Sequence, residues 1–91
     1  IPKSQIIDIA KEDKNIAAFL AFSPVYRWQV IEYDHFTEVR FTDLRYRNKG
    51  YYPFVAVAQI DEHLRVRNSY TGWIFSEQKL QKKLFFGDST T

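Results

Sequence analysis

Apolar residues between positions 4 and 22 recur every three or four residues, the spacing that places side chains on one face of a helix. These residues are Ile6, Ile9, Ala10, Ile16, Ala17 and Leu20. The polar run KEDKN at 11–15 interrupts this face, and either Asp13 or Asn15 is a suitable cap for a second helix. The pattern predicts two short helices or one helix with a break, ending at Ser23-Pro24 because a residue before proline avoids the α region.

Four segments with strand patterns follow, separated by short turn sequences. They span residues 25–34, 37–47, 52–60 and 64–70. Apolar and polar residues alternate in three of them, as in half-buried strands, whereas YPFVAVAQI is apolar on both faces, like a covered central strand. The turns between them contain Asp34-His35, Asn48-Lys49-Gly50 and Asp61-Glu62-His63. We expect an α+β fold in which a four-stranded antiparallel meander is covered by an N-terminal helix or helix pair.

The alternation in the second strand segment changes phase partway along. Val39 and Phe41 are at odd positions, whereas Leu44 and Tyr46 are at even positions. Because side chains alternate with a period of two, one extra residue in a β-bulge at Thr42-Asp43 would account for the change. The same alternation predicts that Arg40 lies on the solvent face of the strand.

The C-terminal residues predict a short helix followed by a tail. Ser76 can cap the segment EQKLQKKL at 77–84, in which Leu80 and Leu84 are four residues apart. We expect the final FFGDSTT, residues 85–91, to form a frayed tail.

The composition is typical of one folded soluble domain. The 91 residues include 18% aromatic and 26% charged residues, which supply a single core and a solvated surface. The net charge of +2 is too small to indicate nucleic acid or a membrane surface as a partner. No apolar run reaches the roughly 18–20 residues of a membrane span, and there is no cysteine. The chain has no methionine and begins IPKSQ, which indicates either processing or excision from a longer protein. We favour the second alternative and interpret residues 1–91 as a single excised domain.

No sequence motif for catalysis or metal binding is present. The two histidines, His35 and His63, fall in turns at the same end of the predicted meander, roughly 10 Å apart. A metal shared by them would need neighbouring carboxylates, and exposed turn histidines are the preferred interpretation. No serine, carboxylate pair or glycine-rich loop stands in a recognisable catalytic setting. We therefore assign no catalytic residue, no metal ligand and no cofactor to this chain.

The densest group of charged and aromatic side chains lies in FTDLRYRNKGYYPF, residues 41–54. Its candidate ligand-binding residues are Asp43, Arg45, Tyr46, Arg47 and Tyr51. Arginine forks match carboxylate and phosphate groups, and tyrosines add donors and stacking faces. We favour a structural alternative, in which Asp43 accepts hydrogen bonds from Arg45, Arg47 or a backbone N–H and the other arginine stems lie over aromatic rings.

Several short motifs, taken in order, resemble the C-terminal soluble region of the YfhP-type proteins. They are AKEDKNIAAFLAFS at 10–23, VRFTDLRYR at 39–47, YPF at 52–54 and SYTGW at 69–73. The resemblance covers roughly residues 6–76. The matching pattern positions are Asp43, Leu44, Arg45, Tyr46, Pro53, Phe54, Gly72 and Trp73.

The YfhP-type family is described as membrane-bound, metal-dependent hydrolases with several transmembrane helices in the N-terminal half. The His and acidic residues behind the hydrolase label belong to that half. The resemblance therefore implies that this chain is the C-terminal, extramembrane part of a membrane-anchored, hydrolase-like protein. The domain itself would be soluble and cytoplasmic, and any divalent metal would belong to the parent protein.

These implications predict a noncatalytic accessory or regulatory domain that contacts the membrane-embedded portion of the same chain. The alternative is a small anion-binding or catalytic module centred on Asp43 and Arg45, with Tyr46 and Tyr51. No nucleic-acid partner is expected, because the weak net charge counts against one. An exposed sheet edge would allow a homodimer.

Overall fold

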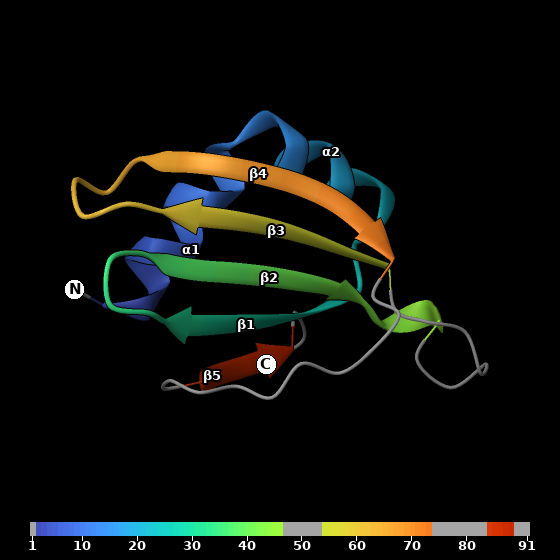
Figure 1. Ribbon diagram of the computed structural model, residues 1–91. Coiled ribbons are helices and arrows are strands. Elements are labelled where there is room, and N and C mark those ends of the chain that lie inside the picture. The colour runs from blue at the N-terminus through green and yellow to red at the C-terminus, as the bar shows by residue number, and fades with distance from the viewer. Residues whose placement is uncertain (1, 47–53, 74–83, 89–91) are drawn as a thin grey trace.

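Two helices and one antiparallel sheet form two layers in the computed structural model, which describes residues 2–46, 54–73 and 84–88 (Figure 1). The helices are α1 (Lys3–Glu12) and α2 (Lys14–Phe22), and both lie on the same face of the sheet. The strands are β1 (Tyr26–Glu32), β2 (Thr37–Asp43), β3 (Phe54–Ile60), β4 (Val66–Trp73) and β5 (Leu84–Asp88). A short 3-10 helix, η1 (Leu44–Tyr46), follows β2.

The strand order in the sheet is β4-β3-β2-β1-β5, and every neighbouring pair is antiparallel. The first four strands are therefore the predicted meander, and the helix pair covers it as predicted. The fifth strand extends the sheet beside β1, so that β4 and β5 lie at its two edges (Figure 1).

The break between the helices occurs at Asp13, one of the two caps that the sequence predicts. Its side chain accepts hydrogen bonds from the backbone N–H of Asn15 at 3.0 Å and of Ile16 at 3.3 Å. These two donors have no partner within the first turn of α2, and a capping carboxylate satisfies them. Asp13 therefore ends α1 and begins α2 at the same residue.

The core fills the space between the helix pair and the covered face of the sheet. Its helical members are Ile6, Ile7, Ala10, Ile16 and Phe19, and its strand members are Val30, Val39, Phe41, Ala56, Ala58 and Ile60. Burying each valine, isoleucine or phenylalanine side chain stabilises the fold by about 1.5–3 kcal/mol. The alanines of β3 leave room for the helices to approach the sheet, because a larger side chain there would hold the layers apart.

The predicted bulge at Thr42-Asp43 is wrong. Pairing between β1 and β2 is regular as far as Tyr26 opposite Asp43. The phase change in the sequence instead marks the point where the chain leaves the sheet and turns into η1. The irregular register lies between β3 and β4, where Gln59 is opposite Asn68 but Ile60 is opposite Val66. Arg67 is therefore the extra residue of a bulge.

The expected tail at 85–91 is corrected by the structure, because Leu84–Asp88 pairs with β1 as a strand. The predicted helix at 77–84 lies outside the described residues except for Leu84, which begins β5. The predicted fourth strand also begins later than expected. Leu64 lies in the turn with a φ of 62°, a left-handed conformation, and β4 starts at Val66.

Arg40 does not lie on an open solvent face, contrary to the prediction. Its side chain is only 15% exposed, and its Nη2 atom lies 3.0 Å from Oε2 of the buried Glu38. Both residues belong to the sheet face that points away from the helices, where Ile31, Val55 and Val57 are also buried. Arg40 and Glu38 therefore form a largely desolvated ion pair on that face.

Candidate functional site

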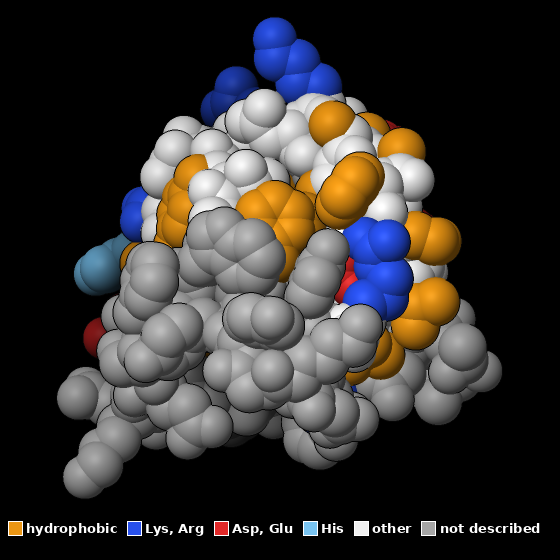
Figure 2. All heavy atoms as spheres, turned by 90° about the vertical axis from the view of Figure 1, so that its right-hand side faces the viewer, with side chains coloured by type: hydrophobic (Ala, Val, Ile, Leu, Met, Phe, Trp, Pro, Cys, Tyr) orange, Lys and Arg blue, Asp and Glu red, His pale blue; other side chains and the backbone are white. Residues whose placement is uncertain are grey.

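The polar cluster predicted around Asp43 lies where α2 and β2 both end. Ser23 directly follows α2, Asp43 is the last residue of β2, and Arg45 lies within η1. Figure 2 shows this end of the molecule, where hydrophobic side chains gather around adjacent basic and acidic side chains. The ends of α2 and of β2, about twenty residues apart in the sequence, therefore meet at one carboxylate.

The Asp43 carboxylate is completely buried and accepts hydrogen bonds at both oxygens. Oδ1 accepts the backbone N–H of Arg45 at 2.9 Å and its Nε–H at 3.1 Å. Oδ2 accepts the hydroxyl of Ser23 at 2.5 Å and the Nη2–H of Arg45 at 2.7 Å. The Arg45 guanidinium therefore binds the carboxylate through two of its nitrogens, a charge-assisted geometry that is stronger than a neutral hydrogen bond.

Arg45 also holds the C-terminal end of α2. Its Nη2 donates to the carbonyl oxygen of Phe22 at 3.1 Å, one of the carbonyls that a helix end leaves without an intrahelical partner. The guanidinium carbon lies 5.0 Å from the centre of the Phe22 ring, within the range of a cation–π contact. One arginine thus joins η1, the end of β2 and the end of α2.

The environment of Asp43 favours its charged form. Burial opposes ionisation, but hydrogen bonds from the Arg45 side chain, from Ser23 and from the Arg45 backbone outweigh it, so the pKa of Asp43 is lowered. A carboxylate with a lowered pKa is a weak base at neutral pH, and its lone pairs here are occupied by internal donors. Such a group is suited to holding the ends of α2 and β2 together.

The structure brings together only part of the predicted ligand-binding set. Asp43 and Arg45 are in contact, with the hydrogen bonds that the structural alternative expects. Tyr46 is the last residue of η1, but its side chain lies outside what the structure describes. Arg47 and Tyr51 lie outside the described residues.

Sequence reasoning missed Ser23 and Phe22 as members of this cluster. The Ser23-Pro24 pair predicts only a helix end, and nothing in its immediate sequence indicates a partner twenty residues away. Phe22 ends the apolar run of α2 yet is 61% exposed, which is unusual for a phenylalanine.

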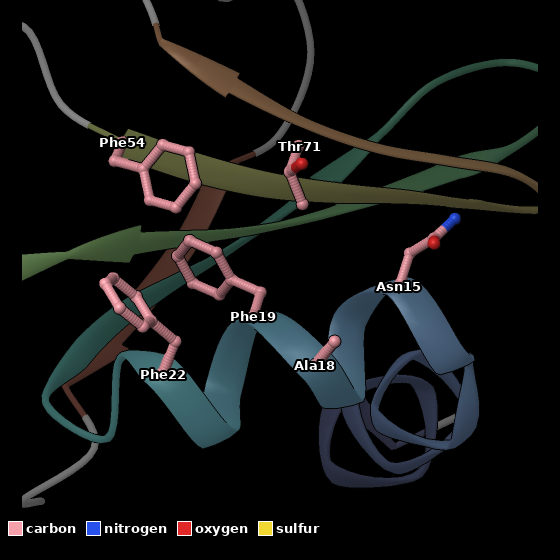
Figure 3. Close-up of a pocket in the computed structure, with 6 residues that line it drawn as sticks. All are labelled: Asn15, Ala18, Phe19, Phe22, Phe54 and Thr71. Atoms are coloured by element: carbon pink, nitrogen blue, oxygen red, sulfur yellow. The ribbon is translucent and has the colours of Figure 1, made fainter.

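A shallow apolar groove lies beside the cluster, between α2 and the strands β3 and β4. It has a volume of about 300 Å³ and is lined by Asn15, Ala18, Phe19, Phe22, Phe54 and Thr71. Figure 3 shows Phe19 and Phe22 extending from α2 toward Phe54, with Asn15 farther along the helix. The rings of Phe19 and Phe54 are tilted, with their centres 5.3 Å apart. Phe22 thus contributes to the groove as well as contacting Arg45.

The two histidines are exposed. His35 lies in the turn between β1 and β2, and its Nδ1 is 3.7 Å from Oε1 of Glu62 in the turn between β3 and β4. Within residues 2–46, 54–73 and 84–88, no group of three or more His, Asp or Glu residues is arranged to hold a metal ion. In the same ranges, no helix has both the length and the apolar character needed to cross a membrane.

Comparison with known proteins identifies the family. Residues 5–84 match the model of the YfhP C-terminal alpha/beta plait domain. The chain is 61% identical over 87 residues to a protein of Bacillus subtilis (strain 168) named "Uncharacterized protein YfhP". This match covers 96% of the chain but only 27% of the length of the relative. No solved structure matches the chain. The family match covers α1 from Gln5 onward, α2 and the first four strands, and the chain therefore belongs to the YfhP C-terminal alpha/beta plait domain family.

Proposed function

We propose that this chain is a noncatalytic accessory domain of a longer protein and acts by contacting the remainder of that protein. The resemblance to the YfhP-type proteins implies that the remainder is membrane-embedded and hydrolase-like and that the accessory domain is cytoplasmic. The domain would regulate or position the remainder, and any divalent metal would be bound there.

The main support for this proposal is that the Asp43 carboxylate makes only internal hydrogen bonds. A catalytic or ligand-binding carboxylate needs a lone pair that a substrate, water or metal can reach. The Asp43 carboxylate is completely buried, and both of its oxygens accept hydrogen bonds from Ser23 or Arg45. The most conspicuous polar cluster of the described residues is therefore better suited to fixing the fold than to chemistry.

The share of the Bacillus relative that lies outside the match supports a role within a larger protein. The matched region is 27% of that relative, so roughly three quarters of the relative lies outside the match, where the domain could contact it. An accessory role also accounts for the exposure of Phe22 at the end of α2 and of Val25 just before β1, since exposed apolar residues that lie together mark contact surfaces.

The experiment separates the two parts of the Bacillus relative. The region that matches this chain and the region outside the match are expressed as separate chains and purified in a nonionic detergent. Their association is then measured. We expect the two parts to associate, and we expect the isolated 91-residue domain to bind no stoichiometric zinc and to hydrolyse neither a nitrophenyl ester nor a nitrophenyl phosphate. Absence of association, or hydrolysis by the isolated domain that is lost in Asp43→Asn, would overturn the proposal.

The anion-binding alternative has one favourable observation, since the Arg45 side chain is 43% exposed. Its test is inorganic phosphate added to the isolated domain during thermal unfolding. A ligand that binds only the folded state raises the melting temperature with concentration. We expect no rise beyond that seen in an Arg45→Ala variant, because the guanidinium is already engaged by Asp43 and Phe22.

A further inference from the structure

The edge of the sheet formed by β4 has one side without a partner strand. β4 pairs with β3, and among the strands that the structure describes none pairs with its other side. Figure 1 shows this edge at the top of the sheet, with α2 behind it. An edge strand presents a row of backbone N–H and C=O groups that can pair with an additional strand.

The middle of β4 has few of the features that prevent such pairing. Proteins protect an edge with proline, with charged side chains or with a bulge. Residues 68–72 read NSYTG and contain neither proline nor a charged residue. The bulge at Arg67 lies before this stretch, so it leaves residues 68–72 regular. The backbone N–H and C=O groups along the free side of residues 68–72 can therefore pair with one added peptide strand of similar length.

The apolar groove adjoins the same edge strand. Thr71 of β4 lines it, and the opposite wall is Ala18 and Phe22, two exposed residues of α2 that lie one turn apart. Asn15 links the two walls farther along, since its amide donates to the hydroxyl of Ser69 at 2.8 Å. A strand added to β4 would direct alternate side chains toward α2, because side chains of a strand alternate between the two faces of the sheet.

A second copy of this chain fits the groove poorly. If two copies paired antiparallel through residues 68–72, with Tyr70 opposite Tyr70, the helix-facing side chains brought to the groove would be Ser69 and Thr71 of the other copy. These are small and polar, whereas the groove is about 300 Å³ and is walled by three phenylalanine rings. A segment that carries a large apolar side chain complements the groove, because its burial covers the rings.

We propose that β4 and the groove beside α2 form a docking site for an extended segment of the remaining part of the longer protein. The segment adds as a strand to residues 68–72, and one of its large apolar side chains enters the groove between Ala18, Phe22 and Phe54. Main-chain hydrogen bonds supply affinity in this mode of recognition, and the pocket supplies selectivity for the side chain. The inference rests on the proposed function, and the remaining three quarters or so of the Bacillus relative provide the source of the segment.

The test uses two arginine substitutions on neighbouring residues of the same helix. Ala18→Arg places a long charged side chain in the groove, whereas Ala17→Arg places it at an exposed position of α2 that does not line the groove. Arginine favours helices nearly as well as alanine does, so both variants should fold. The binding partner is the region of the Bacillus relative outside the match, purified in nonionic detergent.

The affinities of the two variants and hydrogen exchange in the wild-type chain test the docking site. We expect Ala18→Arg to weaken association about tenfold or more, as loss of a central apolar anchor does, and Ala17→Arg to change it less than about twofold. Amide hydrogen exchange in the wild-type chain should slow at residues 68–72 when the partner is added. Equal affinity of both variants together with unchanged exchange at 68–72 would overturn the docking site while leaving the proposed function standing.

Two other outcomes have different meanings. If the wild-type chain does not associate with the partner, the proposed function itself fails, and the docking site fails with it. If the chain alone forms a dimer that Ala18→Arg dissociates, the occupant is a second copy, and the assignment to the remaining part of the longer protein is wrong. Light scattering across a concentration series without the partner measures this.

Discussion

The hydroxyl of Ser23 donates a 2.5 Å hydrogen bond to Oδ2 of Asp43, across twenty residues of sequence and entirely within the interior. This contact joins the end of the helical layer directly to the end of a central strand. Arg45 completes the connection from the other side, since it binds the same carboxylate and the carbonyl of Phe22. The relative position of the two layers at this end therefore depends on one ionised side chain.

Asp43→Asn should destabilise the domain substantially. The amide keeps the shape of the carboxylate but removes its charge, and it places an N–H₂ group against donors of Ser23 and Arg45. Hydrogen bonds to a charged group contribute about 1.5–3 kcal/mol each, and a mismatched buried donor adds a further cost. We expect a loss of about 2 kcal/mol or more, or a fall in melting temperature on the order of 10 °C for a domain of this size.

The matched control for this change is Asp8→Asn, the same substitution at an exposed position of α1. Surface substitutions of this kind usually change stability by less than about 0.5 kcal/mol. Arg40→Ala is unsuitable as a surface control, because Arg40 pairs with the buried Glu38. If Asp43→Asn melts at the same temperature as Asp8→Asn, the carboxylate does not hold the layers together.

Ser23→Ala should cost less than Asp43→Asn, and the two effects should not add. Removing the hydroxyl leaves Oδ2 with the guanidinium of Arg45 as donor, so we expect a loss of about 1 kcal/mol. Each single substitution disrupts the hydrogen bond between Ser23 and Asp43, so the second substitution cannot remove it again. Neighbouring residues that share a network typically show a coupling of about 0.5–3 kcal/mol. Urea unfolding of the four proteins in the cycle measures this coupling. Additive losses would show that Ser23 acts independently of Asp43.

The contribution of Asp43 to stability should disappear in acid. Its pKa in the folded state is lowered, because hydrogen bonds from Arg45 and Ser23 outweigh the effect of burial. A group whose folded pKa is lowered contributes stability fully above its unfolded pKa of about 3.9 and loses that contribution as the pH falls through the folded value. The difference in melting temperature between the wild type and Asp43→Asn should therefore be constant near neutral pH and shrink below about pH 4.

Comparing the two proteins isolates Asp43 from other acids with the same behaviour. Asp61 also has a lowered pKa, chiefly because its carboxylate accepts the backbone N–H of Arg65 and of His63. It is present in both proteins, so its acid-sensitive contribution cancels in the difference. A difference that stays constant down to pH 2 would mean that Asp43 does not stabilise the fold through its charge.

Features that depend on nearby residues were predictable from the sequence. The helix break at Asp13 and the alternating strands of the meander follow from contacts within a few residues or from simple periodicity. The pairing of Asp43 with Arg45 was predictable for the same reason, since the two are separated by one residue. A bulge and a strand end produce the same phase change in a sequence, which is why the sequence predicts a bulge at Thr42-Asp43 where β2 ends and η1 begins.

Features that depend on distant residues were not predictable. Ser23 carries no local sign of its partner, because its role follows from packing α2 against the sheet. The segment around Phe85 and Phe86 does not alternate, so it lacks the pattern of a half-buried strand. Its pairing with β1 spans more than fifty residues of sequence, and only the folded sheet reveals it.

The contact between Trp28 and Gly87 provides a direct test of this fifth strand. The two residues are opposite each other in β1 and β5. A Cβ atom added at Gly87 would lie 2.6 Å from Cζ2 of Trp28 and 2.8–2.9 Å from Cε2 and Nε1. These distances are shorter than van der Waals contact. The indole ring of Trp28 is rigid and packs against the core, so it can move only if its neighbours also shift. Gly87→Ala therefore forces the ring to move or β5 to leave the sheet.

Gly87→Ala should lower stability by about 1–3 kcal/mol, the usual cost of overpacking. Gly72→Ala is the matched control, because a Cβ at Gly72 in β4 would have no heavy atom within 4 Å. Both changes are made in a Trp73→Phe background, which leaves Trp28 as the single indole of the chain. We expect Gly87→Ala to change the fluorescence of Trp28 and to lower the melting temperature, whereas Gly72→Ala should leave the fluorescence unchanged. Since both substitutions add the same methyl group to a strand glycine, identical fluorescence and melting would mean that β5 does not pack against Trp28.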